Sequence, residues 1–195
     1  MSGLEDLYRE IILDHYSNPR HRGELQVPPA TRTEGFNPLC GDETVVYLEI
    51  KDNSIANIAI GGRGCSISQS SASMMSQLVH GKSLDEVRDF VKIFKMMLSI
   101  HESSLGSVTA LANQESNDPG DGSIDNLQGE SVQGESVQGE SQDGDSRLLT
   151  PEELASLGDL AALQGVVKFP VRIKCALLPW NTLTQSIEEA LELSP

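Results

Sequence analysis

The chain has 195 residues, and its 29 acidic against 14 basic side chains give a formal net charge of -15. This excess of acid argues against nucleic acid and against an anionic membrane as partners, because both are bound through clustered lysine and arginine. The sequence shows neither a transmembrane run nor a signal peptide, and its three cysteines are an odd number for a disulfide framework. We therefore expect a cytoplasmic protein whose thiols are free or metal-bound.

The first third of the chain predicts a helix followed by a β-hairpin. Apolar residues recur at helical spacing between residues 4 and 12, Ser2 and Glu5 form a capping box, and the helix is expected to stop before Pro19. After a proline-containing loop, residues 44–50 and 54–60 predict two strands joined by turn residues. The glycine-rich stretch that follows residue 60 is expected to break the second strand.

The rest of the chain predicts helices. One is expected to begin near Cys65 and end at Gly81, and the next begins at a second capping box made by Ser83 and Glu86. A short helix is predicted to start at residues 150–153, where a cap residue precedes a proline. In the last helix, Pro179 lies either in the first turn or at a kink in a helix that starts near Pro170. Because strands come early and helices late, we expect an α+β fold with a small antiparallel sheet packed against helices.

Residues 113–147 differ from the rest of the chain in composition. Nine acidic side chains and no basic one lie between residues 113 and 146, and the segment repeats Val-Gln-Gly-Glu-Ser. One apolar residue in five cannot offset the entropy of ordering. We therefore expect one domain formed by residues 1–112 and 148–195, with 113–147 as a disordered acidic insert. The insert serves either as a solvated spacer or as an acidic docking tail for a basic partner.

Three cysteines and one aspartate are the candidate site residues. Each cysteine is expected beside a structural break: Cys40 in a loop before the hairpin, Cys65 at a helix N-terminus, and Cys175 shortly after Pro170. A free cysteine is often only a small buried apolar residue. The Cys-Gly-Asp spacing, however, turns the thiolate of Cys40 and the carboxylate of Asp42 toward one point. With the other two cysteines this gives three sulfurs and one oxygen, a donor set suited to an exchangeable zinc site.

Four blocks of sequence resemble a known family. Residues 7–20, 37–42, 62–75 and 172–180 occur in the order found in the IscU/NifU N-terminal superfamily of iron–sulfur cluster assembly proteins, and they are most similar to its SufU branch. Together with the segments between them, these blocks span nearly all of the chain outside the acidic insert. The resemblance implies an IscU/SufU-like α+β fold.

The resemblance also implies a site and an activity. The metal ligands would be Cys40, Asp42, Cys65 and Cys175, and Arg172 would be a contact at the site. Lys174 stands where IscU-type proteins have histidine, and their Leu-Pro-Pro-Val-Lys motif is missing. Both departures point to SufU-type proteins, which are zinc-dependent sulfurtransferases. Such a protein would accept persulfide sulfur onto Cys40 from a SufS-type cysteine desulfurase and pass it to downstream SUF assembly proteins.

Other functions remain open at this stage. The same ligands could hold a nascent iron–sulfur cluster on a scaffold, and a zinc-stapled interaction domain without turnover is a third possibility; Lys174 favours the sulfurtransferase. Arg172 could equally be a solvated cation, and Lys174 is expected at the surface or in docking. The four histidines are expected to be surface residues or hydrogen-bonded core residues rather than ligands: His15, His21, His80 and His101.

Overall fold

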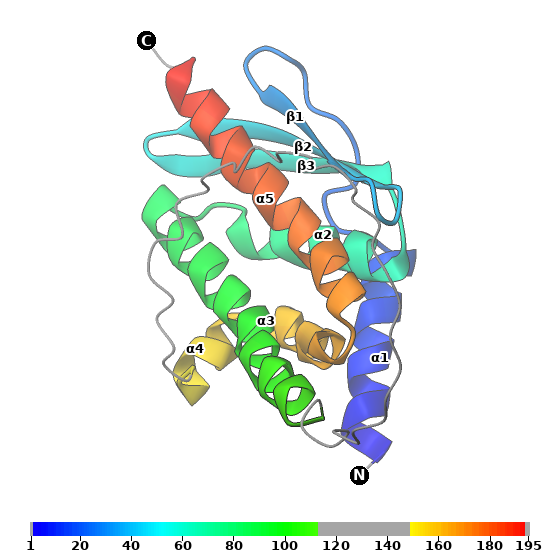
Figure 1. Ribbon diagram of the computed structural model, residues 1–195. Coiled ribbons are helices and arrows are strands. Elements are labelled where there is room, and N and C mark those ends of the chain that lie inside the picture. Colours follow the sequence, from blue (N-terminus) through cyan, green and yellow to red (C-terminus); the bar gives the residue numbers. More distant parts are fainter. Residues whose placement is uncertain (1, 113–148, 194–195) are drawn as a thin grey trace, which may run out of the picture.

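A three-stranded antiparallel sheet forms one layer of the molecule (Figure 1). The computed structural model describes residues 2–112 and 149–193. The sheet is a meander of β1 (Thr31–Asn37), β2 (Asp42–Lys51) and β3 (Ser54–Arg63), with β2 in the middle. The hairpin of β2 and β3 confirms the sequence prediction. Asp52 and Asn53 form its turn at positive φ, a conformation that short polar side chains adopt more readily than other residues do.

Two details of the sheet correct the sequence prediction. The proline-containing loop before the hairpin also holds β1, which the sequence analysis missed because the strand's inward residues are small or polar. Gly35 faces α5 so closely that a Cβ there would lie 2.0 Å from Thr182 Oγ1. Also, the glycines after residue 60 do not break β3. Gly62 pairs with Thr44, and its φ of +100° together with its approach to the Glu43 carbonyl leaves no room for a side chain.

Helices cover one face of the sheet (Figure 1). The last helix, α5 (Pro170–Glu192), packs against β1 and β2, and α2 (Ser66–Val79) packs against α5 and β3. The first helix, α1 (Ser2–Ser17), lies along α2. Trp180 of α5 is fully buried and stacks on Phe94, with ring centroids 4.7 Å apart. The apolar core therefore lies between the sheet and the helices.

The remaining elements close the core on the side away from the sheet. They are α3 (Leu84–Ala112), the short α4 (Pro151–Ser156) and a 3₁₀ helix, η1 (Gly158–Lys168), which contributes buried Leu160 and Leu163. This 3₁₀ helix was not predicted from the sequence, although its buried apolar residues at 160, 163 and 167 follow a helical spacing. No helix in the described part of the chain is long and apolar enough to span a bilayer.

Local helix signals were the most reliable sequence predictions. Ser83 and Glu86 form the predicted capping box, and Thr150 forms another with Glu153 ahead of Pro151. Of the two alternatives for the last helix, the one that starts near Pro170 is correct, since α5 begins at Pro170 and holds Pro179 inside it. The α+β fold class is confirmed. The predicted acidic insert at 113–147 lies outside the described residues, so its disorder stays a prediction.

Candidate metal centre

Four of the predicted site residues come from three separate parts of the fold that meet at one end of the sheet. Cys40 lies in the turn between β1 and β2, and Asp42 is the first residue of β2. Cys65 is the N-cap residue of α2, and Cys175 lies in the second turn of α5. These elements are far apart in the sequence, so the proximity of the four side chains depends on long-range packing rather than on one local loop.

The β1–β2 turn presents Cys40 to solvent. Asn37 organises this turn, because its side-chain oxygen accepts the N–H of Leu39 at 3.1 Å and its carbonyl accepts the N–H of Gly41 at 2.8 Å. Gly41 adopts φ +71°, which a glycine reaches without steric cost. As a result Cys40 is exposed, whereas the side chain of Asp42, two residues later, is buried.

Asp42 lies at the centre of the cluster. Its Oδ1 accepts the backbone N–H of Cys65 at 2.9 Å, and its Oδ2 accepts the thiol of Cys65 at 3.3 Å. Burial alone would raise the pKa of this carboxyl, but the Cys65 N–H and the surrounding thiols hold the pKa below its usual range. The approach also requires Gly64, since a Cβ there would lie 2.8 Å from Asp42 Cγ.

Cys175 is the buried member of the cluster. Its Sγ lies 3.4 Å from Cys40 Sγ and 3.7 Å from the carbonyl oxygen of Val171. Burial, the Cys40 thiol and the nearby negative groups raise the pKa of the Cys175 thiol. The expectation that every cysteine stands beside a structural break is wrong here. Cys175 lies within α5 because Pro170 occupies the helix N-terminus, where a proline is tolerated.

The structure brings three of the four predicted ligands into direct proximity. The donor atoms of Cys40, Asp42 and Cys175 all lie within 4.8 Å of one another. Cys65 is not part of that mutual set and reaches it through Asp42. Within the described side chains, no histidine joins the group. Three sulfurs around one carboxylate oxygen suit a tetrahedral zinc ion, with the carboxylate as the exceptional donor.

Arg172 and Lys174 lie close to this cluster in sequence but apart from it in contacts. Both side chains are exposed on α5. Among the described residues, neither forms an ion pair or a side-chain hydrogen bond with the cysteines. A contact of Arg172 with an incoming group therefore stays a prediction.

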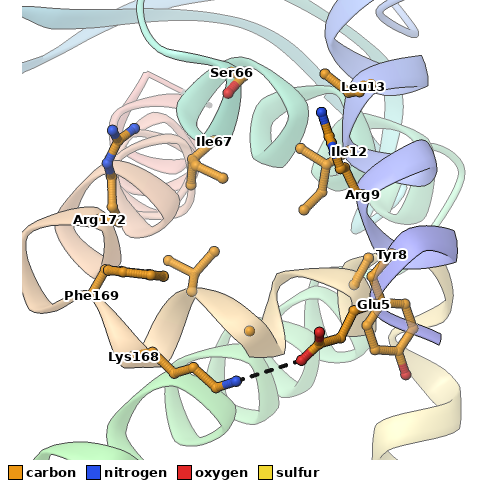
Figure 2. A pocket seen from close by; sticks show the side chains of 13 residues that line it. Glu5, Tyr8, Arg9, Ile12, Leu13, Ser66, Ile67, Lys168, Phe169 and Arg172 are labelled. Atoms are coloured by element: carbon orange, nitrogen blue, oxygen red, sulfur yellow. Dashed lines mark ion pairs between the residues drawn. The ribbon is translucent and has the colours of Figure 1, made fainter. Parts of the chain in front are cut away.

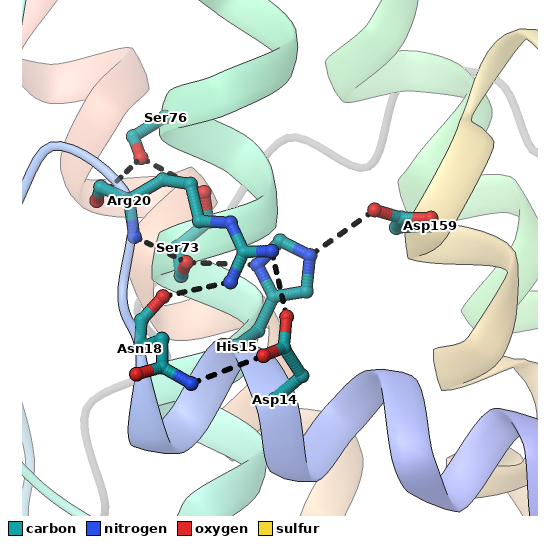
Figure 3. Close-up of polar contacts among 7 residues, drawn as sticks. All are labelled: Asp14, His15, Asn18, Arg20, Ser73, Ser76 and Asp159. Atoms are coloured by element: carbon teal, nitrogen blue, oxygen red, sulfur yellow. Dashed lines mark hydrogen bonds and ion pairs between the residues drawn. The ribbon is translucent and has the colours of Figure 1, made fainter.

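A buried polar junction joins α1, α2 and η1 (Figure 3). His15 of α1 is almost fully buried, as the sequence analysis expected for a core histidine. Its Nδ1 lies 2.8 Å from Ser73 Oγ, and its Nε2 lies 3.1 Å from Asp159 Oδ2. Ser73 Oγ also accepts the backbone N–H of Arg20 at 2.8 Å. The junction thus ties α1, α2 and η1 together.

Asn37, Gly64 and the hydroxyl of Ser71 position the site, and the sequence analysis gave none of them a role. Ser71 Oγ donates to the carbonyl oxygen of Ala176 at 2.7 Å, which joins α2 to α5 beside Cys175. Asn37 and Gly64 lie within the family-like blocks and adjoin candidate ligands, a signal that could have identified both. Ser71 lies in a serine-rich helix, where nothing local distinguishes it.

Comparison with known proteins gives a consistent result. The family model described as "NifU-like N terminal domain" matches residues 7–116. A zinc-dependent sulfurtransferase SufU from Bacillus subtilis is 32% identical over 95% of this chain and 92% of its own length. An iron–sulfur cluster assembly scaffold protein IscU from Streptococcus pyogenes is 30% identical over 97% of this chain and 88% of its own length.

A solved structure shares the fold. The crystal structure of the N-terminal part of a nitrogen-fixing NifU-like protein from Brucella abortus superposes with a TM-score of 0.63. The superposition covers 98% of this chain and 99% of the other, at 19% sequence identity. At that identity the likeness concerns the fold alone.

Proposed function

The chain belongs to the NifU-like N-terminal domain family of iron–sulfur cluster assembly proteins, and from that premise we propose that it is a zinc-dependent sulfurtransferase. In this proposal Cys40 accepts persulfide sulfur from a SufS-type cysteine desulfurase, and downstream SUF assembly proteins receive it. The observation that carries the proposal is the asymmetry of the thiols. Cys40 is exposed on a turn, while Cys175, 3.4 Å away, is buried.

The exposure of Cys40 suits it to meet a sulfur donor on another protein. Its thiolate attacks the outer sulfur of the desulfurase persulfide, the sulfur–sulfur bond of the donor breaks, and the donor cysteine leaves as a thiolate. Sulfur is thereby carried as a persulfide on Cys40, and no external oxidant is needed. The turn of Asn37 and Gly41 holds Cys40 outside the core, so the attack needs no opening of the buried part of the cluster.

The donor set supports zinc as the resident metal. Asp42 and Cys175 are buried, while Cys65 is half-buried at the N-terminus of α2. A zinc ion bound by these groups would keep the sulfurs deprotonated at neutral pH without redox chemistry of its own. Burial, the Cys40 thiol and the nearby negative groups raise the pKa of the Cys175 thiol, and a bound cation would oppose that shift. Free thiols also accord with a cytoplasmic location, which belongs to the same proposal.

Arg172 completes the proposed site as a cation at its entrance. It is exposed one turn before Cys175 on α5, so its guanidinium is free to bind an anionic group of an incoming donor. Lys174 is exposed on the same helix and takes the place of the histidine of IscU-type proteins. A lysine there adds no metal donor at neutral pH, which favours the sulfurtransferase.

A scaffold function is the second candidate, since a relative named as an IscU scaffold is 30% identical over most of the chain. In that case the same four side chains would bind a nascent iron–sulfur cluster as cargo. Metal analysis of protein purified without oxygen separates the two functions. Zinc without iron or acid-labile sulfide supports the sulfurtransferase, whereas iron with stoichiometric sulfide supports the scaffold.

Trapping the transferred sulfur tests the role of Cys40. The protein is mixed with a SufS-type desulfurase and cysteine, alkylated, and mapped by peptide mass spectrometry. We expect a persulfide on Cys40, with Cys65 and Cys175 unmodified. Cys40→Ala is expected to bind the desulfurase without raising its turnover, and Ser71→Ala is the control that leaves every thiol intact. A persulfide confined to Cys65 or Cys175 would refute the assignment.

A further inference from the structure

A groove of about 620 Å³ lies beside the candidate metal centre (Figure 2). Its walls come from α1, the first turn of α2, η1 and the first turn of α5. No candidate metal ligand lines it, but the groove adjoins two of them. Ser66 and Ile67 follow Cys65 directly, and Arg172 lies one turn before Cys175. A molecule seated in the groove would therefore touch the segments that carry two of the candidate ligands.

The floor of the groove is apolar and partly open to solvent. It contains Ile12, Ile67, Val166 and Phe169, and Figure 2 shows Phe169 and Ile67 facing Ile12 across the opening. Phe169 is 60% exposed, and Leu13 at the rim is 45% exposed. Large apolar side chains that stay exposed around one depression are typical of a protein-binding surface rather than of ordinary solvent-facing structure.

The rim of the groove has the opposite charge to the protein as a whole. The whole chain carries -15, yet Arg9 and Arg172 stand on opposite walls and Lys168 lies at one end (Figure 2). Within the described residues, neither arginine has an ion-pair partner. Lys168 meets Glu5 at 3.8 Å, with both side chains exposed, and such a pair contributes little. The groove is thus a local basic site on an acidic protein.

We propose that this groove docks an acidic segment of a partner protein that carries bulky apolar side chains. The apolar side chains would cover Phe169 and Ile67, and flanking carboxylates would reach Arg9 and Arg172, whose planar guanidinium groups favour carboxylates. A nucleic acid needs more clustered cations than the three that line the groove. Charge complementarity therefore selects an acidic peptide, and the inference does not depend on the sulfurtransferase activity.

Binding of a designed probe tests the proposal on the full chain. The probe is a fluorescent helical peptide with leucine and phenylalanine on one face and glutamate on the other, and its matched control has glutamine for glutamate. We expect saturable binding of the acidic probe in fluorescence anisotropy. Arg9→Glu and Phe169→Ser are each expected to weaken it about tenfold, the usual scale for an anchoring residue.

Two control variants make the same changes elsewhere. Lys92→Glu reverses an exposed charge on α3, and Leu193→Ser removes an exposed apolar residue at the far end of α5. Both should bind the probe as the unaltered protein does. Because all four positions are exposed, the variants should keep the circular dichroism spectrum and the zinc content of the unaltered protein.

Four results would overturn the proposal. The first is an absence of saturable binding, and the second is equal binding of the acidic and the glutamine peptides. The third is a concentration-dependent dimer in sedimentation that Phe169→Ser abolishes, since a second copy of the chain would then be the occupant. The fourth is tighter binding of both the acidic and the glutamine peptides after deletion of residues 114–146, since the chain's own acidic segment would then be the competitor, whereas relief of charge repulsion would favour the acidic peptide alone.

Discussion

The candidate metal centre and the His15 junction are both polar clusters inside an apolar fold, but they differ in how their polar groups are satisfied. At the junction, Ser73 Oγ meets both His15 Nδ1 and the Arg20 N–H at 2.8 Å. At the centre, the thiol of Cys175 has longer contacts, 3.4 Å to Cys40 Sγ and 3.7 Å to the carbonyl oxygen of Val171, and it also lies close to the Asp42 carboxylate. The polar groups of the junction therefore satisfy one another at ordinary hydrogen-bond distances, whereas the contacts of the Cys175 thiol at the centre are longer.

Two buried hydroxyl groups, close in sequence to the candidate ligands, also lack hydrogen-bond partners among the described residues. Thr44 Oγ1, two residues after Asp42, and Ser68 Oγ, three residues after Cys65, have no hydrogen-bond partner among the described residues. Leaving a buried polar group without a partner costs about 1–3 kcal/mol. A polar cluster whose groups satisfy one another stabilises the fold. A cluster with unsatisfied groups is suited to bind something from outside.

Removing a sulfur from the centre should give the largest effect. Cys175→Ser is expected to lose most of the bound zinc and to lower the free energy of unfolding by several kcal/mol, since structural zinc contributes of order 10 kcal/mol in small domains. Zinc per chain and urea unfolding measure both effects. Ser71→Ala removes the neighbouring α2–α5 hydrogen bond without removing a donor, and should cost about 1 kcal/mol with full zinc. Unchanged zinc in Cys175→Ser would contradict the ligand assignment.

Oxidation of the metal-free protein tests which two of the three thiols lie close enough to form a disulfide. Because the Sγ atoms of Cys40 and Cys175 lie 3.4 Å apart, a mild thiol oxidant should join these two cysteines and leave Cys65 free. Closing a loop of this length should raise the stability of the metal-free chain by roughly 4–5 kcal/mol over its reduced form. Peptide mapping without reductant identifies the bond, and Cys65→Ser should form it equally well. A disulfide that contains Cys65 is the result that would count against this geometry.

At the junction, His15→Ala should destabilise the fold and spare the metal. The substitution leaves a cavity and removes a buried hydrogen bond of Ser73, which together should cost about 3 kcal/mol. Zinc per chain should not change. Asp159→Asn is the matched control, because the Asp159 side chain is 49% exposed and its ion pair should contribute about 1 kcal/mol at most. Loss of zinc in His15→Ala would show that the two clusters are not separable.

The smallest expected effect is a pH dependence at the exposed edge of the junction. Hydrogen bonds from Arg20, at 2.6 Å, and from Asn18 hold the pKa of Asp14 below its usual range. A lowered carboxyl pKa stabilises the fold fully above the unfolded-state pKa, and this contribution disappears as the pH falls through the folded-state pKa. The melting-temperature difference between the unaltered protein and Asp14→Asn should therefore shrink on acidification. A difference that grows at low pH would contradict this origin.

The fold was predictable where the signal is local. The Asp52–Asn53 turn and the capping box of Ser83 with Glu86 lie within a few residues, so the sequence alone indicates them. Strand β1 was not predictable, because its inward Gly35 becomes informative only against Thr182 in α5. The small inward side chains that let α5 approach so closely also remove the apolar alternation by which a strand is recognised.

The candidate site was likewise predictable only where its residues lie close together in the sequence. The Cys-Gly-Asp spacing suggested that Cys40 and Asp42 act together. Cys175, 135 residues from Cys40, was grouped with them on donor chemistry and on the resemblance to a family, because no local spacing connects it to them. The groove had no sequence signal, since Arg9, Ile67 and Phe169 come from three different elements. Their proximity is a product of helix packing, which no local pattern encodes.

The position of Cys175 in the last described helix has a consequence for how the protein is made. Synthesis runs from the N-terminus, so β1, β2, β3 and α2 emerge before α5 exists. A nascent chain therefore presents Cys40, Asp42 and Cys65 while the fourth candidate donor is still missing. The long sequence separation between the donors also delays their meeting during folding. Metal loading of a new chain should thus wait for the docking of α5, so an ion bound by all four candidate donors would indicate that α5 has reached its place.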